Sequence, residues 1–179
     1  TPCYVRLGRS SVEDVYTEDT VFDFSKPHVV REGKDAVIFA CGLMVQSALK
    51  AAEKLSAEGK EVAVVDVCAI KPCNEEQIAE LLAKYDVVFT AEEHNIIGGL
   101  GGLICEIAAD KCPKKIHRIG IQDTYAESGD ANKLMAKYKL DGEETVNKEK
   151  GIVTEVLSDT VIAGRIDKLI LPFRAVTLR

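Results

Sequence analysis

The sequence predicts a three-layer α/β/α fold, in which helices cover both faces of a mostly parallel sheet. Two observations lead to this prediction. Near-continuous apolar runs, typical of strands buried on both faces, occur at residues 35–41, 61–70 and 86–93. Each run is followed after a short connection by a helical pattern of apolar positions, and strands that alternate with helices in this way pair in parallel.

The first half of the chain predicts two strands and one helix. A short strand at residues 28–32 precedes a Gly-Lys turn and the buried strand at 35–41. The helix over residues 42–59 carries its apolar positions on one face, and Gly59 is placed to end it. These apolar positions are Val45, Ala48, Leu49, Ala52 and Leu55.

The second half continues the alternation. A helix follows Lys71-Pro72, with Asn74 as its N-cap and acidic residues in its first turn. After the strand at 86–93 come a helix at 100–112, a strand at 114–121, a loop, and a helix at 130–140. Ser128 or Asp130 caps this last helix. The polar, acidic residues 10–27 read as a linker along the surface.

Composition and charge exclude several classes of protein. The net charge of −6 over 179 residues argues against a general nucleic-acid surface, and no apolar run reaches the ~20 residues of a membrane span. The six cysteines form no CxxC pair. Cys41, Cys68 and Cys105 lie in apolar runs, which predicts buried, reduced thiols and a cytoplasmic protein. The three histidines show no metal-ligand spacing with the cysteines.

The glycine-rich stretch at residues 98–102 follows a buried strand and precedes a helix. The dinucleotide fingerprint G-x-G-x-x-G does not fit it, and no Lys-Ser/Thr pair follows as in a Walker loop. We favour a sharp turn whose glycines let the helix start close to the sheet. Weak phosphate binding at the N-terminus of that helix stays open.

Glu92, Glu93 and His94 come at the carboxyl end of a predicted parallel strand, the edge at which ligands gather in open α/β sheets. General acid–base chemistry would require this carboxylate–imidazole pair to face a cleft. The H-E-x-x-H zinc pattern is absent from the sequence. A hydrogen-bonded loop or a subunit contact is therefore the favoured interpretation.

Two further segments carry polar groups that could bind an anion. Arg6 and Arg9 flank the end of a short strand predicted at residues 3–7, and a planar guanidinium there could hold a phosphate at two points. An ordinary surface arginine is the commoner case. The stretch Glu127-Ser-Gly-Asp130 resembles many anion or sugar loops, although helix capping explains it without a ligand.

Several segments together resemble the C-terminal region of the transketolase family, in the same order and spacing. They are "REGKDAVIFACGLMVQSALKAAEKL", "VVDVCAIKPCNEEQI", "VVFTAEEHNIIGGLGGLICEIAA" and "RIGIQDTYAESGDANKLMAKYKL". The resemblance covers residues 2–141. It implies a five-stranded sheet whose first strand is antiparallel to the other four. Residues 1–9 then resemble the last strand of a preceding pyrimidine-binding domain, with a linker at 10–27 and the C-terminal domain at 28–158.

The family transfers two-carbon ketol units between phosphosugars, a reaction of the pentose phosphate pathway, with thiamine diphosphate and a divalent metal such as Mg²⁺ or Ca²⁺. The resemblance implies that the other domains or subunit of the enzyme hold this cofactor, so this chain would bind none and would be inactive alone. It also implies a homodimer. The family's phosphate-binding arginine falls on Arg9 in Leu7-Gly8-Arg9, while Glu92, Glu93 and His94 become architecture near a domain or subunit interface.

Two other functions remain open. A 2-oxo acid dehydrogenase E1 beta subunit shares the same kind of C-terminal domain, although "AESGDANKLMAKYKL" favours the sugar enzyme. A metabolite-binding regulatory module could use the helix N-terminus at Gly101. The tail departs from the family pattern, and residues 159–179 are expected to be an extension whose role the sequence does not indicate.

Overall fold

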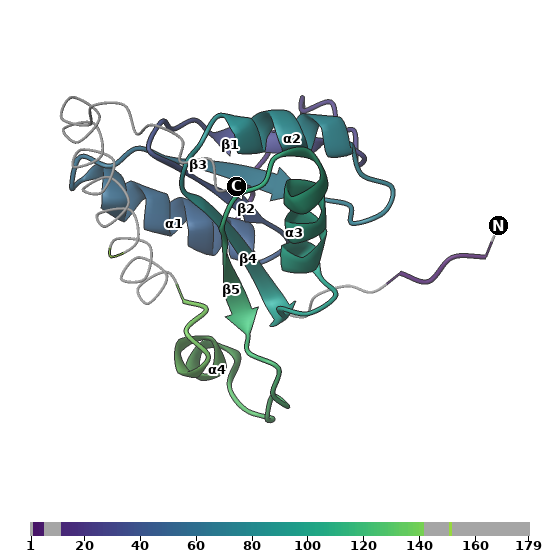
Figure 1. The fold of residues 1–179 in the computed structure, drawn as a ribbon. Coiled ribbons are helices and arrows are strands. Elements are labelled where there is room, and N and C mark those ends of the chain that lie inside the picture. The colour runs from purple at the N-terminus through teal and green to yellow at the C-terminus, as the bar shows by residue number, and fades with distance from the viewer. Residues whose placement is uncertain (1, 6–11, 142–150, 152–179) are drawn as a thin grey trace, which may run out of the picture.

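The computed structural model describes residues 2–5, 12–141 and 151. Its centre is a five-stranded sheet with the order β1-β3-β2-β4-β5 (Figure 1). The strands are β1 (Pro27–Arg31), β2 (Ala36–Ala40), β3 (Val62–Val67), β4 (Val88–Asn95) and β5 (Ile116–Ile121). The helices are α1 (Met44–Ser56), α2 (Glu75–Ala83), α3 (Leu100–Lys111) and α4 (Ala131–Lys137).

The strand directions confirm the predicted sheet. β1 is antiparallel to β3, whereas the pairs β2–β3, β2–β4 and β4–β5 are parallel. Between β2 and β3 the register runs from Ala36 opposite Val62 to Ala40 opposite Asp66. Because parallel strands end on the same side, the ends of β2, β3, β4 and β5 together form what we call the carboxyl edge of the sheet.

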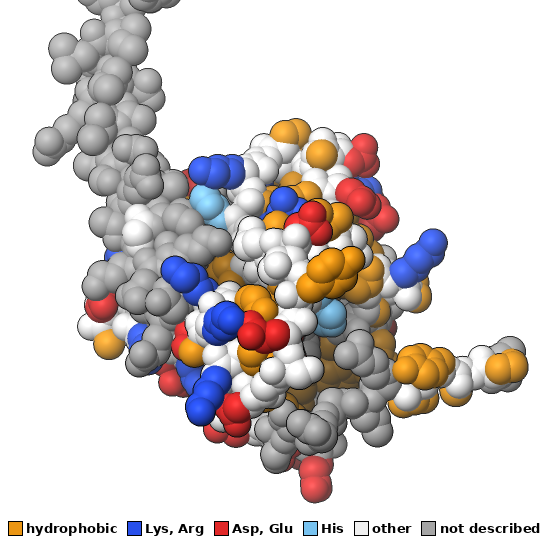
Figure 2. Space-filling model, turned by 90° about the horizontal axis from the view of Figure 1, so that it is seen from below, with side chains coloured by type: hydrophobic (Ala, Val, Ile, Leu, Met, Phe, Trp, Pro, Cys, Tyr) orange, Lys and Arg blue, Asp and Glu red, His pale blue; other side chains and the backbone are white. Residues whose placement is uncertain are grey.

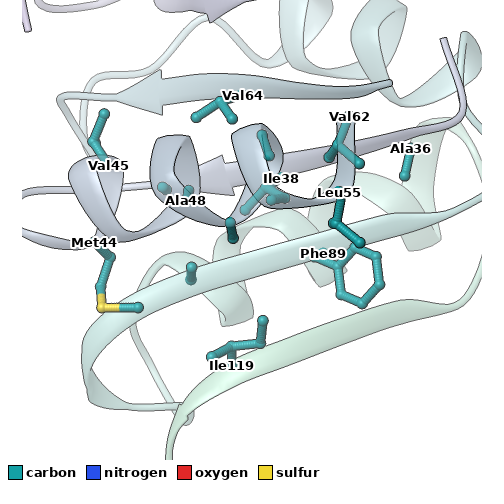
Figure 3. Packing of buried hydrophobic residues seen from close by; sticks show 14 of the residues in the cluster. Ala36, Ile38, Met44, Val45, Ala48, Leu55, Val62, Val64, Phe89 and Ile119 are labelled. Carbon is teal, nitrogen blue, oxygen red and sulfur yellow. The ribbon is translucent and has the colours of Figure 1, made fainter. Parts of the chain in front are cut away.

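Each face of the sheet has its own core, which explains the unbroken apolar runs. Successive strand residues point to opposite faces, and all residues of β2 are fully buried. On one face α1 packs Met44, Ala48 and Leu55 near Ile38 and Phe89 (Figure 3). On the other face α2 and α3 pack together; the residues buried there include Val37, Phe39, Val65, Ile78, Leu82, Val88, Leu100 and Ile104.

The helix ends follow the predicted signals. After α1, Gly59 adopts φ +80°, and its N–H donates to the carbonyl of Ser56 at 2.9 Å. Asn74 caps α2 by accepting a hydrogen bond from the N–H of Gln77 at 3.1 Å. At α4 the cap is Asp130, which accepts from the N–H of Lys133 at 3.1 Å. The alternative of Ser128 is therefore settled in favour of Asp130.

Residues 12–26 contain no helix or strand and lie against the domain. Tyr16 packs edge-on against Phe22, with ring centroids 4.6 Å apart, and Phe22 stacks on His28 of β1 at 4.5 Å. At the start of this segment the Glu13 carbonyl accepts a hydrogen bond from Gln46 in α1. The segment thus crosses from the first turns of α1 to the β1 side of the sheet.

Some expectations from the sequence differ from the structure. Cys68 is exposed, because the apolar run continues past the last residue of β3 into a surface loop. Residues 2–5 form no strand (Figure 1). They are exposed, with Tyr4 at 89%. Arg6 and Arg9, and the tail except Gly151, lie outside the described residues. Among the residues that are described, no helix is long and apolar enough to cross a membrane.

Candidate functional site

The carboxyl edge gathers several polar groups. They include Glu92, Glu93 and His94, which the sequence singled out, and Asp66, which it did not. Asp66 lies near the end of β3, and Glu92, Glu93 and His94 lie near the end of β4. Burial separates them sharply, since Glu92 is 1% exposed and Asp66 is 8% exposed, whereas Glu93 and His94 are exposed. The predicted carboxylate–imidazole pair therefore divides into one buried carboxylate and two surface side chains.

Glu92 acts as an internal cap for α3. One carboxylate oxygen, Oε2, accepts the N–H of Leu100 at 2.8 Å, and the other, Oε1, accepts the N–H of Gly101 at 2.8 Å. Backbone N–H groups at a helix N-terminus lack partners within the helix and carry partial positive charge. A buried carboxylate is stable there because both of its oxygens are hydrogen-bonded and face that charge.

The glycines of the loop make room for this carboxylate. A Cβ atom at Gly99 would lie 2.0 Å from Glu92 Oε2, and one at Gly101 would lie 2.9 Å from Glu92 Oε1. The sequence analysis favoured a turn whose glycines bring the helix close to the sheet. The reason for glycine at positions 99 and 101 is that the Glu92 carboxylate occupies the space of a side chain there. The N–H of Gly101 donates its hydrogen bond to Glu92. It is therefore not available to a phosphate at the N-terminus of this helix.

Thr90 lies two residues before Glu92 on β4 and is fully buried. Its hydroxyl has no hydrogen-bond partner among the described residues. The hydroxyl is 3.1 Å from where a Cβ of Gly101 would lie, so it fills space beneath the first turn of α3. The Cδ of Arg118 approaches the same point at 2.9 Å.

The loop that follows Glu92 is fixed at several points. The N–H of Ile96 donates to Ile121 at 3.0 Å, which extends the pairing of β4 with β5. Arg118 donates to the carbonyl of Ile96 at 3.0 Å, and the N–H of Ile97 donates to the Asn95 side chain at 2.9 Å. The Asn95 side chain in turn donates to Asp123 at 3.3 Å, which joins this loop to the one after β5.

On the other side of β2, Asp66 accepts a hydrogen bond from the hydroxyl of Tyr16 at 2.6 Å. Burial and this carboxylate both raise the pKa of Tyr16, so the phenol stays protonated and remains the donor. Burial, and after it the negative charge of Glu92, raises the pKa of Cys41 at the end of β2 to about 12. A thiol held in the neutral form is a poor nucleophile. The hydrogen bond from Tyr16 to Asp66 joins residues 12–26 to the sheet on this side of the carboxyl edge.

Sequence reasoning missed the Tyr16–Asp66 pair because its members are 50 residues apart and only the register of β3 brings them together. One signal was available: Asp66 is a single charged residue within an otherwise apolar strand. Such a residue requires a partner. A shallow depression at the start of α2, lined by Ser25, Cys73, Asn74, Glu75 and Glu76, includes none of the predicted site residues.

The described residues do not fit the metal and diphosphate of the cofactor that the transketolase resemblance implies. Both oxygens of Glu92 are engaged by backbone N–H groups. Within the described part of the chain, no group of three or more His, Cys, Asp and Glu residues could hold a metal ion. No catalytic step through such a cofactor is therefore derived from this chain.

Comparison with known proteins identifies the family. The transketolase C-terminal domain family matches residues 25–144, which include β1 to β5 and α1 to α4 of the described part of the chain. The chain belongs to this family.

Two relatives illustrate the similarity. A protein named as a transketolase C-terminal section from Methanocaldococcus jannaschii is 40% identical over 150 residues, which cover 82% of this chain and 46% of that protein. One of the subunits of an apulose-4-phosphate transketolase from Phocaeicola vulgatus is 35% identical, with 79% and 46% covered. This chain spans about half the length of these relatives.

Similar solved structures agree with the fold. A split-gene transketolase, described as an inactive β4 tetramer, superposes with a TM-score of 0.76 at 36% identity, covering 82% of this chain and 48% of that one. A transketolase from Leishmania mexicana has a TM-score of 0.54 at 22% identity, which supports the fold alone.

The 1-deoxy-D-xylulose-5-phosphate synthase of Caldanaerobacter subterraneus is 38% identical in sequence over 76% of this chain and 22% of its own length.

Proposed function

We propose that this chain is the C-terminal domain or subunit part of a transketolase, an enzyme that transfers two-carbon ketol units between phosphosugars. Its contribution is structural: it supports assembly of the enzyme, while thiamine diphosphate and a divalent metal bind to the other domains or subunit. Family membership over residues 25–144 and the half-length match to proteins named as a section or subunit support this proposal.

The geometry of Glu92 carries the structural role. It is the buried carboxylate nearest to the family's glycine loop, and it gives both oxygens to the backbone of α3. A general acid or base must exchange a proton with the substrate, which these two hydrogen bonds oppose. Glu93 and His94 are exposed at the surface, which suits contact with other parts of the enzyme.

The proposal is tested by calorimetry with thiamine diphosphate and Mg²⁺. The isolated 179-residue chain should give no binding heat. Addition of the cofactor-binding half should produce binding of the cofactor, and transfer of ketol units from xylulose phosphate to an acceptor phosphosugar. Tight, metal-dependent binding by the isolated chain would refute the structural assignment.

Arg9 is the one residue of this chain that we propose to touch substrate, as a ligand of the sugar phosphate in the assembled enzyme. Replacing a two-point guanidinium contact by Lys or Met weakens transition-state binding of a phosphorylated substrate. We expect Arg9→Met to reduce kcat/KM at least tenfold for phosphorylated donors and to leave an unphosphorylated donor nearly unaffected. An equal loss for both donors would exclude the phosphate role.

A second candidate function is that of a 1-deoxy-D-xylulose-5-phosphate synthase, supported by 38% identity to one such enzyme. A 2-oxo acid dehydrogenase is the third candidate. Product analysis separates the three. The assembled enzyme should consume xylulose phosphate without pyruvate if it is a transketolase. Formation of 1-deoxy-D-xylulose 5-phosphate, or oxidation of pyruvate, would favour the alternatives. Sedimentation of the same sample tests the expected homodimer.

A further inference from the structure

Two bulky side chains are exposed on neighbouring loops of the carboxyl edge. Ile97, in the loop after β4, is 62% exposed, and Tyr125, in the loop after β5, is 101% exposed. β4 and β5 are adjacent and parallel, so both loops leave the sheet on the same side. Figure 2 views the molecule from below, the direction in which β4 and β5 point in Figure 1, and hydrophobic side chains reach the surface there among charged ones.

The loop with Ile97 is held in place although its side chain faces solvent. Glu92 anchors its end at α3, and Arg118 holds the carbonyl of Ile96. The 3.3 Å hydrogen bond from Asn95 to Asp123 joins it to the loop of Tyr125. Binding through a surface that is already ordered loses little conformational entropy.

The surroundings of these two side chains have the composition of a protein interface. Aromatic and aliphatic anchors occupy the centres of protein interfaces, and polar residues form their rims. Here the exposed Glu93 and His94 lie at the end of β4, just before the loop of Ile97, and the exposed Glu127 follows Tyr125. A small-molecule site would require a concave pocket, whereas these side chains project outward.

The path of the chain indicates which partner lies at this edge. Glu13 contacts Gln46 and pairs with Lys50 at 3.6 Å, so the polypeptide enters the domain beside the first turns of α1. Those turns directly follow the end of β2 and therefore lie at the carboxyl edge. The relatives are about twice as long as this chain.

We propose that Glu93, His94, Ile97 and Tyr125 form the docking surface for the cofactor-binding half of the enzyme. This inference rests on the proposed function. It assigns Ile97 and Tyr125 as the anchors and Glu92 as the residue that positions the loop bearing Ile97.

Photo-crosslinking in the assembled enzyme tests the surface. A photoreactive phenylalanine analogue replaces Ile97, and the matched control carries it at Val21, which is 92% exposed in the 12–26 segment. Position 97 should crosslink to peptides of the cofactor-binding half, and position 21 should do so at least tenfold less. In parallel, Ile97→Asp should weaken association of the two halves at least tenfold, with the thermal unfolding of the variant chain unchanged.

Several outcomes would overturn the docking surface. Crosslinks from position 97 to a second copy of this chain would assign the surface to self-association. Equal crosslinking from positions 21 and 97, or normal association of Ile97→Asp, would remove Ile97 as an anchor while the transketolase function stands. Failure of the unsubstituted halves to associate or to turn over xylulose phosphate would reject the proposed function together with the surface.

Discussion

Glu92 shows how one residue can supply the anion that a helix N-terminus attracts. Its carboxylate accepts two N–H groups of α3 from within the fold, at 2.8 Å each. The charge is stabilised by the helix dipole, and the helix gains partners for two donors that would otherwise have none. The sequence shows a glutamate and the glycines, but not that they meet, because the distance across the loop depends on its backbone path.

We predict that Glu92→Gln destabilises the protein by about 1–3 kcal/mol, because an amide NH₂ would then face a backbone N–H in a buried site. Chemical denaturation of the isolated chain measures this change. Glu93→Gln is the matched control, since Glu93 is adjacent and exposed, and its free energy of unfolding should stay within about 0.5 kcal/mol of the parent. Equal stabilities for both variants would contradict the capping role.

A second residue-scale prediction concerns pH. Cys41 has a pKa of about 12 in the folded chain, against 9.0 for a free thiol, mainly because its partial burial disfavours the thiolate. Above pH 9.0 the unfolded chain loses a proton that the folded chain keeps, so stability falls as pH rises towards 12. The slope from this thiol is at most about 1.4 kcal/mol per pH unit.

Urea unfolding on both sides of pH 9.0 tests the role of this thiol. Cys41→Ala should reduce the alkaline loss of stability. Parallel pH profiles for the parent and Cys41→Ala would show that other groups cause the loss.

At the scale of elements, the first turn of α3 contains two adjacent glycines, Gly101 and Gly102, that face different surroundings. A Cβ at Gly101 would meet Glu92, Arg118 and Thr90 within 3.1 Å, whereas a Cβ at Gly102 would meet nothing within 4 Å. We predict that Gly101→Ala destabilises the protein by about 1–3 kcal/mol through overpacking. Gly102→Ala should stabilise it by up to about 1 kcal/mol, because alanine favours a helix. Thermal unfolding of both variants compares the two positions, and a stabilised Gly101→Ala would show that the space is not limiting.

The elements themselves were the most predictable part of the structure. The apolar runs located β2, β3 and β4, and Asn74 marked the start of α2, because periodicity and capping are local properties. The prediction that Cys68 is buried was wrong because the apolar run continues beyond the last residue of β3. Apolar composition alone does not show where a strand leaves the sheet. In the site, the sequence indicated a glycine turn but not its internal anion. It showed Asp66 as a single charge in an apolar strand, but not that Tyr16 is its partner.

At the scale of the whole molecule, residues 12–26 belong to the folded unit although they contain no helix or strand. They provide the Tyr16 hydrogen bond to Asp66, the stacking of Phe22 on His28, and the packing of Val15 on the α1 core. Removing them would leave the carboxylate of Asp66, which is 8% exposed, without its phenol donor.

A chain that starts at residue 27 should therefore be less stable by about 2–4 kcal/mol than one that starts at residue 12, since a charged hydrogen bond and apolar contacts are lost together. Denaturation curves of the two truncated chains measure the difference. Tyr16→Phe in the longer chain should reproduce part of the loss, and Tyr125→Phe, which alters a fully exposed ring, should not. Equal stability of the two truncated chains would show that the segment is only a tether.

The fit between Glu92 and the glycines also bears on how the family diversifies. A carboxylate at position 92 forbids side chains at positions 99 and 101, and conversely any side chain there would displace the carboxylate. These three positions should therefore change together in evolution. In a relative with a small neutral residue at 92, position 99 would have room for alanine or serine, whereas position 101 would still meet the side chains of Arg118 and Thr90.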